Sequence, residues 1–372
     1  MDIPKISKAS VLPAYETPHI MQDIEIPELN DGDVLVKVLL AGVCGTDVHQ
    51  YLGHIPAGGP IEDPPVIQGH EVIGKIVKSM GVTEDVVGNE LKEGDRVIWC
   101  HQWCGKCYSC RILGQPFMCD NSAGYGFADP KKLRGGYAEY ELITAGTDIL
   151  KVPESVKDEE ALGIGCAFRS AVSNYETLLN HGGIKVGENV VVQGVGPIGL
   201  YCTVLAAQSP AAKIITIDMS EPRLEFSKKW GATHTISMNE YTTPEARREK
   251  ILELTGGRGA DVVFEASGAP ASFVEGVDML AKMGRYVVIG QASQRTVDFA
   301  PGKILEKYCV ILGNKGADIR HFYKALNFID AYREKYPFGD IISHKFPLTE
   351  ADKALEVSMK GIALKAVIDN RD

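Results

Sequence analysis

Two kinds of hydrophobic pattern divide the chain. Between about residues 30 and 160, short β-branched runs are broken by Gly, Pro and Asp, and these runs include DVLVKVLLAGV, VIGKIVKSM, DRVIWC and YAEYELITA. Runs of this kind bounded by turn residues are typical of strands, so the pattern predicts a β-rich first domain. From Leu162 to Asn180 the spacing of apolar residues becomes helical.

From Asn189 onward, compact apolar runs alternate with amphipathic stretches. The apolar runs are NVVVQGVG, KIITIDM, DVVFEASG and RYVVIG, and the segments between them are long enough for crossover helices. Strands covered by helices on both faces are apolar throughout, so this alternation predicts a doubly wound parallel sheet. After about Asp318 the elements are mixed again, and we expect the tail to rejoin the first domain. In that tail, TEADKALEVSMK predicts a helix capped by Thr349.

The predicted fold class is therefore α/β with two domains. Residues 1–166 form the β-rich domain, residues 167–318 form the parallel-sheet domain, and residues 319–372 return to the first. A chain of 372 residues exceeds what one hydrophobic core usually serves.

Charge and hydropathy exclude several classes of partner. Lys and Arg total 39 against 49 for Asp and Glu, the net charge is −10, and the basic residues are scattered. This composition argues against binding of nucleic acid or an anionic membrane. The first residues lack the pattern of a secretory signal, and no apolar run is long enough to cross a bilayer, so we expect a soluble cytoplasmic protein.

Five of the nine cysteines lie in one stretch, WCHQWCGKCYSCRILGQPFMCD. In a reducing cytosol, clustered cysteines favour metal binding or catalysis over disulfides. Four of them follow the spacing C-x2-C-x2-C-x8-C, and they are Cys104, Cys107, Cys110 and Cys119. Four thiolates complete tetrahedral zinc without leaving a position for water, which predicts a structural zinc lobe at residues 100–120. Redox thiols or a metal-free cluster are the alternatives.

A glycine-rich turn follows the first apolar run of the second domain. The segment VVVQGVGPIG has the pattern G-x-G-x-x-G, and its turn residues are Gly194, Gly196, Pro197, Ile198 and Gly199. The first Gly permits the tight turn, the second lets a pyrophosphate approach the backbone, and the third allows close packing of helix on strand. The pattern predicts a dinucleotide site, and its alternative is an ordinary glycine-rich turn.

The end of the next strand bears on which dinucleotide binds. Asp218 ends KIITID, 24 residues after Gly194. A carboxylate there can accept hydrogen bonds from ribose hydroxyls and repels a 2′-phosphate, which favours NAD over NADP. Arg223 complicates this prediction, because its guanidinium could contact the ribose, contact a 2′-phosphate or lie in solvent.

A second set of candidate metal ligands is spread over three motifs. The motifs are AGVCGTDVH, QGHEVIG and GIGCAF, and they contribute Cys44, His70 and Cys166. Individually, a Cys in an apolar run is commonly a small buried hydrophobe, and a lone His commonly a packed, hydrogen-bonded residue. Together they would form a Cys2His site with an open fourth position, which is typical of a catalytic zinc that polarises an alcohol oxygen and lowers its pKa.

The motifs together resemble those of zinc-dependent medium-chain alcohol dehydrogenases. GVCGTDVH, GHE, CGKCYSC with Cys119, GVGPIG and GIGCAF occur in the order found in that family, and the resemblance covers essentially the whole chain. It implies a GroES-like catalytic domain split around a Rossmann coenzyme domain. It also implies that an alcohol substrate and the nicotinamide meet at zinc, with a dimer or tetramer as the assembly.

The resemblance assigns roles to residues around the predicted ligands. It implies that Glu71 approaches the metal during ligand exchange, with a salt bridge as the alternative. Asp47 is placed like the acid that orients the zinc-bound imidazole. Thr46 resembles the hydroxyl that receives the alcohol proton, and His49 resembles the base that passes it to solvent. Ser170 resembles the small hydroxyl residue that meets the nicotinamide.

Two positions depart from the family pattern. The last gap of the cysteine lobe is one residue longer than the family's usual seven, so we expect the loop to bulge at Gly114. Lys365 stands where many relatives carry an arginine that contacts the cofactor pyrophosphate. A lysine keeps the charge without the bidentate fork, which predicts weaker binding of NAD.

The substrate pocket is the least determined part. Residues expected near it are Tyr51, Trp99, Cys100, His101 and Arg169. Arg169 either forms a salt bridge between the domains or recognises an anionic or polar hydroxyl substrate. Cysteine as the third ligand favours the alcohol dehydrogenase branch over polyol and threonine dehydrogenases, which commonly use a carboxylate. A non-catalytic NAD-binding zinc protein is a further alternative.

Overall fold

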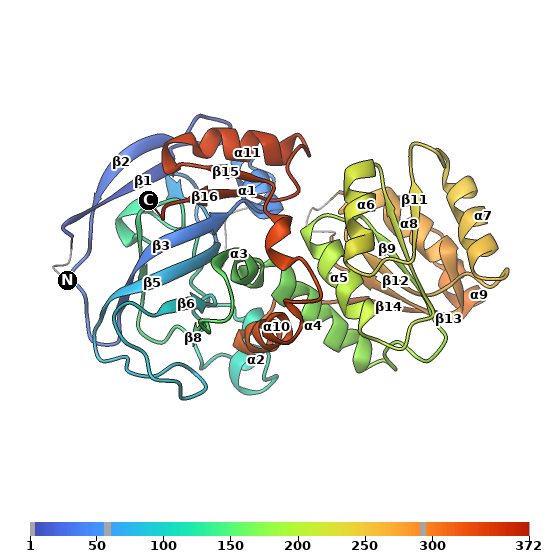
Figure 1. The fold of residues 1–372 in the computed structure, drawn as a ribbon, viewed down its shortest axis with the longest axis horizontal. Coiled ribbons are helices and arrows are strands. Elements are labelled where there is room, and N and C mark those ends of the chain that lie inside the picture. The colour runs from blue at the N-terminus through green and yellow to red at the C-terminus, as the bar shows by residue number, and fades with distance from the viewer. Residues whose placement is uncertain (1–3, 56–60, 291–294, 372) are drawn as a thin grey trace. The chain divides into compact units, whose positions relative to one another are not determined.

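The chain forms two compact units (Figure 1). A computed structural model describes residues 4–55, 61–290 and 295–371. Unit 1 combines Met1–Arg169 with Ala317–Asp372, and unit 2 comprises Ser170–Gly316. The boundaries lie beside those expected at 166 and 318. Within the described ranges, none of the helices combines the length and the apolar character that crossing a bilayer would require.

Unit 1 is rich in β-structure, as the sequence predicts. A three-stranded sheet has the order β2-β1-β4, and a seven-stranded sheet has the order β15-β16-β3-β5-β6-β8 with β7 paired to β3. The strands are β1 (Ile6–Leu12), β2 (Ile20–Glu25), β3 (Val34–Gly42), β4 (Val66–Ile67), β5 (Glu71–Ser79), β6 (Arg96–Trp99), β7 (Tyr140–Ile143), β8 (Ile149–Lys151), β15 (His344–Phe346) and β16 (Ala366–Asp369). Because β16 pairs with β3, the C-terminal segment rejoins the first part of the chain.

Helices and 3-10 turns connect these strands, and α10 is the longest of them. They are α1 (Gly45–Tyr51), α2 (Tyr108–Arg111), α3 (Asp158–Ala161), α10 (Ile319–Tyr332) and α11 (Ala351–Met359), with 3-10 turns η1 (Pro116–Met118), η2 (Pro130–Lys132), η3 (Leu162–Gly165), η4 (Phe338–Ile341) and η5 (Leu348–Glu350). The predicted cap of the last helix is wrong. Thr349 lies inside η5, and Glu350 is the residue that precedes α11. The reason is that a 3-10 turn runs directly into the helix, so the chain is already coiled at Thr349.

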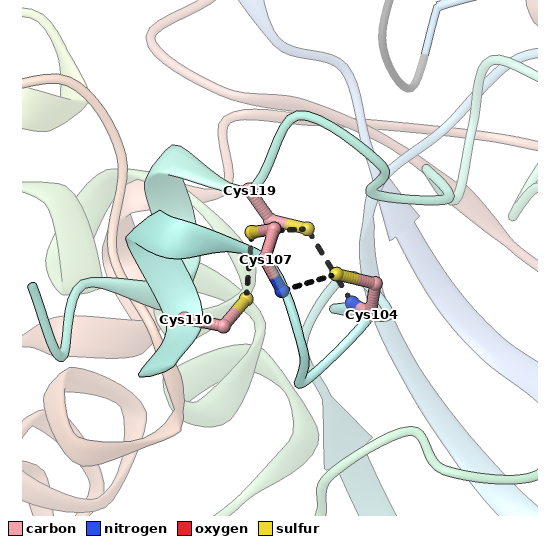
Figure 2. Close-up of side chains that lie close together, drawn as sticks. All are labelled: Cys104, Cys107, Cys110 and Cys119. Atoms are coloured by element: carbon pink, nitrogen blue, oxygen red, sulfur yellow. Dashed lines mark hydrogen bonds between the residues drawn. The ribbon is translucent and has the colours of Figure 1, made fainter. Parts of the chain in front are cut away.

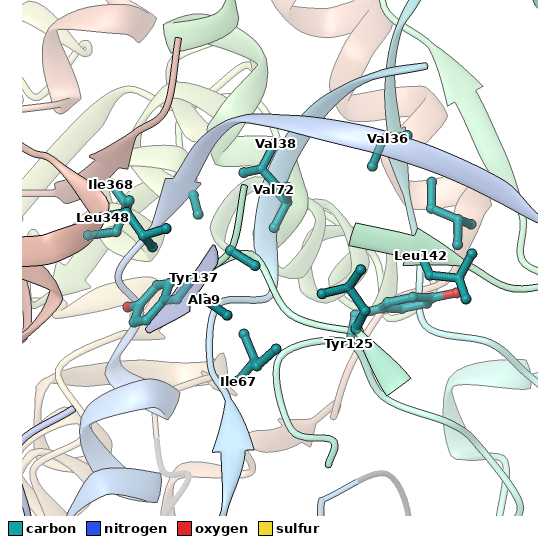
Figure 3. Close-up of a cluster of buried hydrophobic side chains, with 14 of the residues drawn as sticks. Ala9, Val36, Val38, Ile67, Val72, Tyr125, Tyr137, Leu142, Leu348 and Ile368 are labelled. Carbon is teal, nitrogen blue, oxygen red and sulfur yellow. The ribbon is translucent and has the colours of Figure 1, made fainter. Parts of the chain in front are cut away.

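The core of unit 1 lies between its two sheets and the C-terminal segment. Figure 3 shows Val36 and Val38 of β3 near Val72 of β5, with Ala9 of β1 and Ile368 of β16 in the same cluster. These side chains are 5% exposed or less, so β3 is apolar along most of its length because both of its faces are covered.

Unit 2 is a doubly wound parallel sheet, as predicted. Its strand order is β11-β10-β9-β12-β13-β14 and every pair is parallel, which is the order 3-2-1-4-5-6 of dinucleotide-binding folds. The strands are β9 (Asn189–Gln193), β10 (Lys213–Asp218), β11 (His234–Ser237), β12 (Ala260–Glu265), β13 (Leu280–Val288) and β14 (Val310–Gly313). The helices are α4 (Ala167–Leu179), which begins in unit 1, and α5 (Pro197–Ala207), α6 (Glu221–Lys229), α7 (Pro244–Leu254), α8 (Pro270–Met279) and α9 (Gly302–Lys307).

The four apolar runs of the sequence are β9, β10, β12 and β13. The two edge strands, β11 and β14, were not predicted. Each is only four residues long and has a single buried residue, and in β11 polar residues interrupt the apolar pattern. In Figure 1, α5 and α6 lie over one face of the sheet and α7, α8 and α9 over the other, which is why the central strands are apolar on both faces.

Candidate functional site

Pairing of β3 with β5 brings two predicted ligands together. Cys44 follows β3 and caps α1, while His70 immediately precedes β5. In the ladder, Gly42 pairs with Glu71, so Cys44 and His70 leave adjacent strands at the same end.

The third ligand reaches this place through a close backbone contact. A Cβ atom on Gly165 would lie 2.9 Å from the Cα atom of Glu71, so only glycine allows η3 to approach β5 this closely. Cys166 follows directly, and its Sγ atom lies 3.8 Å from that of Cys44. One donor atom from each of Cys44, His70, Glu71 and Cys166 lies within 4.8 Å of the others.

The chemistry of this donor set fits zinc. Two thiolates on one tetrahedral zinc, each at about 2.3 Å, are separated by about 3.8 Å, whereas a disulfide requires about 2.05 Å. The observed separation of Cys44 and Cys166 matches the first value, and all nine cysteines are free. The Oε1 atom of Glu71 is buried without a hydrogen-bond partner, so a further oxygen donor is available.

Asp47 holds two of the ligand residues. Its side chain is fully buried, and its Oδ2 atom accepts the Cys44 amide N–H at 2.7 Å. Its Oδ1 atom accepts the Gly69 N–H at 3.3 Å and lies 3.4 Å from Nδ1 of His70. Burial alone would lower the pKa of His70, but the charges of Asp47 and Cys44 raise it to about 10, so metal binding here must displace a proton.

Glu71 and Lys365 form a buried ion pair beside the ligands. The Lys365 ammonium donates to Oε2 of Glu71 and, at 3.0 Å, to the carbonyl oxygen of Val43. Burial raises the pKa of the Glu71 carboxyl to about 7 against the lowering effect of Lys365. The salt bridge that the sequence analysis gave as the alternative role of Glu71 is therefore present, and both of its side chains are buried. The contact of Lys365 with a cofactor pyrophosphate stays a prediction.

Two residues of α1 are placed to carry a proton. Thr46 and His49 are three positions apart, so their side chains share one face of the helix. The Oγ1 atom of Thr46 lies 3.8 Å from Sγ of Cys44. His49 is half-buried, and its Nδ1 atom lies 3.5 Å from Nδ1 of His54. Thr46 therefore lies beside the ligand cluster, and His49 lies beside the exposed His54.

The cysteine lobe brings its four predicted ligands together (Figure 2). The Sγ atom of Cys107 lies 3.5 Å from that of Cys110 and 3.8 Å from that of Cys119. The Cys107 amide donates to Sγ of Cys104 at 3.4 Å, and backbone N–H donors of this kind lower the pKa of the Cys104 thiol to about 6. Four sulfurs at these separations fit a closed tetrahedral zinc site. Gly114 has φ +62°, a left-handed conformation, in the longer gap before Cys119.

The glycine-rich turn has the geometry that a pyrophosphate requires. Gly194 has φ +86°, and a Cβ on Gly199 would lie 1.9 Å from the carbonyl oxygen of Gly194, so the turn and the helix contact both need glycine. At Gly196, a Cβ would meet only an Arg223 nitrogen, at 4.0 Å, which leaves space for a ligand. Pro197 and Ile198 open α5, whose N-terminus favours a phosphate.

Asp218 lies at the end of β10 against this turn. Its Oδ2 atom accepts the Val195 N–H and its Oδ1 atom accepts the Ser220 N–H, each at 2.8 Å. The carboxylate therefore fixes the turn while it occupies the place expected for the ribose contact. Ser170, the residue expected to meet the nicotinamide, lies half-buried in α4.

Four of the five predicted pocket residues line one small cavity of unit 1 that also reaches the ligand His70. The lining residues are His70, Val72, Trp99, Cys100, His101, Tyr125, Gly165, Arg169 and Phe322. Tyr51 is not among them, because it packs against the hydrophobic core of unit 1. Burial raises the pKa of the Cys100 thiol above its usual range, so Cys100 is an unreactive wall residue.

Sequence reasoning missed several residues of these sites. Tyr125 and Phe322 line the cavity from a loop and from α10, and no motif marks them. Glu265, at the end of β12, is fully buried and accepts the N–H groups of Ser267 and Gly268, so it shapes a loop beside the glycine-rich turn. The sequence could have indicated Glu265, because it is the acidic residue that ends the apolar run in DVVFEASG.

Known proteins resemble both units. Residues 30–154 match the family model described as the alcohol dehydrogenase GroES-like domain, and residues 197–331 match that of the zinc-binding dehydrogenase. The 5-exo-hydroxycamphor dehydrogenase of Pseudomonas putida is 38% identical over 342 residues, which are 91% of this chain and 92% of that protein. The L-threonine 3-dehydrogenase of Proteus mirabilis is 33% identical, over 94% of this chain and 95% of its own.

A solved structure supports the same relationship. The crystal structure of an alcohol dehydrogenase from Thermotoga maritima has a TM-score of 0.89 and 33% identity, and the match covers 98% of this chain and 99% of that one. Sequence and structure therefore agree over nearly the full length.

Proposed function

The chain belongs to the zinc-dependent medium-chain alcohol dehydrogenase family, and from that premise we propose that it transfers hydride reversibly between an alcohol and NAD, giving an aldehyde or a ketone. The observation that carries this proposal is the convergence of Cys44, His70 and Cys166 with the buried Glu71. Three ligands with a fourth position available are typical of catalytic zinc rather than structural zinc.

We propose two zinc ions per chain. One is held by Cys44, His70 and Cys166, where a bound zinc supplies Lewis acidity to the alcohol oxygen. The other is held by the four cysteines of the lobe and stabilises the fold of residues 100–120. Asp47 orients His70 and the Cys44 backbone, and Glu71 serves as an additional oxygen donor during exchange of ligands.

The residues of α1 provide the path for the alcohol proton. Thr46 accepts the proton from the substrate hydroxyl, and His49 passes it to solvent. Support comes from their shared helix face and from the position of Thr46 beside Cys44. A threonine hydroxyl both accepts and donates a hydrogen bond, so it can relay a proton without itself holding a charge.

NAD is the proposed cofactor, in preference to NADP. The glycine-rich turn would hold the pyrophosphate, Asp218 the ribose and Ser170 the nicotinamide. The Asp218 carboxylate already accepts two backbone N–H groups, which fixes it at this place, and its negative charge would repel a 2′-phosphate. Comparison of kcat/KM for NAD and NADP tests this preference, and Arg223→Ala tests whether the arginine changes it.

A secondary alcohol is the proposed substrate type. The names of the two relatives, 5-exo-hydroxycamphor dehydrogenase and L-threonine 3-dehydrogenase, both place the hydroxyl on a secondary carbon. The alternative is a polyol- or threonine-type enzyme of the same family. Oxidation of a panel of primary alcohols, secondary alcohols, polyols and L-threonine, followed as absorbance of the reduced cofactor, separates these substrates.

The zinc assignment is tested by Cys44→Ser, with Cys309→Ser as a matched control outside both clusters. We expect Cys44→Ser to abolish turnover, to lower zinc from about two ions per chain to about one, and to leave NAD binding largely intact. Cys309→Ser should keep both zinc ions and its activity. Retained activity in Cys44→Ser would contradict the mechanism, and loss of zinc and NAD binding together would indicate misfolding.

We also propose a cytoplasmic homodimer or homotetramer. The edge strand β14 supports this assembly, because Val310 is 41% exposed on a strand that has an unpaired edge. Measurement of the mass in solution, with Val310→Lys as the variant, tests the contribution of this edge.

A further inference from the structure

Arg169 is a buried cation, and among the residues that the structure describes its charge has no carboxylate partner. Its side chain is 6% exposed at the start of α4. Its Nη1 atom donates a long hydrogen bond of 3.5 Å to the carbonyl oxygen of Ala317, and its guanidinium lies over the ring of Phe322 at 4.9 Å. The Nε atom is buried without any hydrogen-bond partner. Across residues 4–55, 61–290 and 295–371, no acidic side chain forms an ion pair with Arg169.

Such an arrangement is costly unless a ligand completes it. A buried guanidinium loses its hydration, and an opposite charge or a full set of acceptors normally compensates for that loss. The contact with Phe322 compensates only in part, because a cation over an aromatic face gains less than a full hydrogen-bonded ion pair would supply. The planar guanidinium with free N–H donors is suited to bind a carboxylate through two parallel hydrogen bonds.

The cavity that Arg169 lines offers a second donor. The Nδ1 atom of His101 accepts the Tyr125 N–H at 3.1 Å, so in the neutral ring the proton is on Nε2. Burial, together with the charges of Arg169 and His70, holds the pKa of His101 well below its usual range, so the ring is neutral. The described residues that line this cavity include no Asp or Glu, and its other walls are apolar or aromatic. The cavity therefore presents donors without a competing acidic acceptor.

From these contacts we infer that the substrate is a short-chain hydroxy acid, whose carboxylate binds Arg169 while its hydroxyl lies at His70 and the two ligand cysteines. Arg169 and His70 line the same cavity, which at about 10 Å³ holds roughly one water molecule, so a substrate that reaches both must be short and must displace side chains that line it. This inference rests on the proposed dehydrogenase function and specifies its substrate class.

Matched substrate pairs test the inference with the zinc-loaded full-length protein. Racemic 2-, 3- and 4-hydroxy acids are compared with the alcohols that carry a methyl group in place of the carboxylate, and kcat/KM is measured with NAD. We expect the wild type to prefer the acid in at least one pair. In Arg169→Gln the preference should fall roughly 10- to 100-fold, since a hydrogen-bonded charge contributes about 1.5–3 kcal/mol. Arg169→Lys should recover part of it.

Arg258→Gln is the matched control, because Arg258 is exposed in unit 2 and its removal changes net charge equally. It should leave the preference unchanged. A wild type that prefers the neutral alcohol in every pair would overturn the inference. So would an Arg169→Gln variant that loses the same factor on both members of a pair, because that result assigns Arg169 to balancing the charge of the ligand thiolates.

A binding measurement separates this inference from the proposed function. Butanoate has a carboxylate and no hydroxyl, and we expect it to raise the melting temperature of the wild type but not of Arg169→Gln. Absence of turnover with every alcohol would overturn the dehydrogenase proposal, while a butanoate shift that depends on Arg169 would still support the carboxylate site. Equal shifts in both proteins, or no shift in either, would overturn the carboxylate site.

Discussion

Buried acidic side chains in unit 1 differ in how completely they are satisfied. Asp47 has partners for both oxygens, and Glu71 has one partner. Glu141 on β7 is fully buried, yet neither of its oxygens has a hydrogen-bond partner among the described residues. The resemblance carried by the motif GVCGTDVH allowed Asp47 to be predicted, although only Cys44 is its neighbour in sequence and Gly69 lies 22 positions away. The partner of Glu71 could not be predicted in the same way, since Lys365 is 294 positions away.

The isolation of Glu141 predicts a pH-dependent cost to stability. Burial raises the pKa of this carboxyl well above its ordinary value, so the folded chain holds a proton that the unfolded chain releases above about pH 4.5. The wild type therefore loses stability as pH rises from that value, by up to about 1.4 kcal/mol per pH unit. Glu141→Gln stays neutral in both states, so its advantage over the wild type should grow with pH.

Urea midpoints measured at pH 5, 6, 7 and 8 check this expectation. Glu84→Gln, at an exposed position, is the control and should show a constant difference from the wild type. A difference between Glu141→Gln and the wild type that does not change with pH would contradict the prediction.

At the scale of elements, the two metal clusters differ in how far the sequence determines them. The cysteine lobe places four ligands within one short segment, so their spacing alone predicts that they converge. The other cluster depends on the pairing of β3 with β5 and on the approach of η3, which no local spacing encodes. Resemblance to a family supplied that assembly. The edge strands β11 and β14 were not predicted, and each is only four residues long with a single buried residue.

The approach of η3 to β5 makes Gly165 decisive for the cluster of Cys44, His70 and Cys166. A methyl group at Gly165 would meet the backbone of Glu71 at 2.9 Å, and backbone cannot rotate away as a flexible side chain can. We expect Gly165→Ala to displace Cys166, to lower zinc from about two ions per chain to about one, and to abolish turnover, while the lobe keeps its metal. Metal analysis and the kinetic assay measure both effects.

Gly302→Ala is the control for this prediction. A Cβ on Gly302 would have no atom within 4 Å, so this substitution adds the same methyl group without a clash. It should retain two zinc ions and full activity. A Gly165→Ala variant with both zinc ions in place would show that η3 adjusts to the methyl group.

At the scale of the whole molecule, the proposed metal sites and the proposed nucleotide site belong to different units. Unit 1 contains both ligand clusters and the core around Val36 and Val72. Unit 2 has a separate core that includes Val191 of β9 and Tyr286 of β13. The change in hydrophobic pattern near Leu162 predicted this division. Before it, short β-branched runs are broken by turn residues, and after it, apolar strands alternate with amphipathic helices.

This division predicts a local response to removal of zinc. Because each unit has its own core, a chelator should increase hydrogen exchange in the peptides that hold the ligands, residues 100–120 and 162–170, while the central strands β9, β10 and β12 stay protected. NAD added to the chelated protein should still slow exchange around Gly194 and Gly196, since the turn is built within unit 2. Mass spectrometry of peptides after timed exchange measures both effects. Loss of protection in the central strands on chelation would show instead that zinc stabilises the whole chain as one cooperative structure.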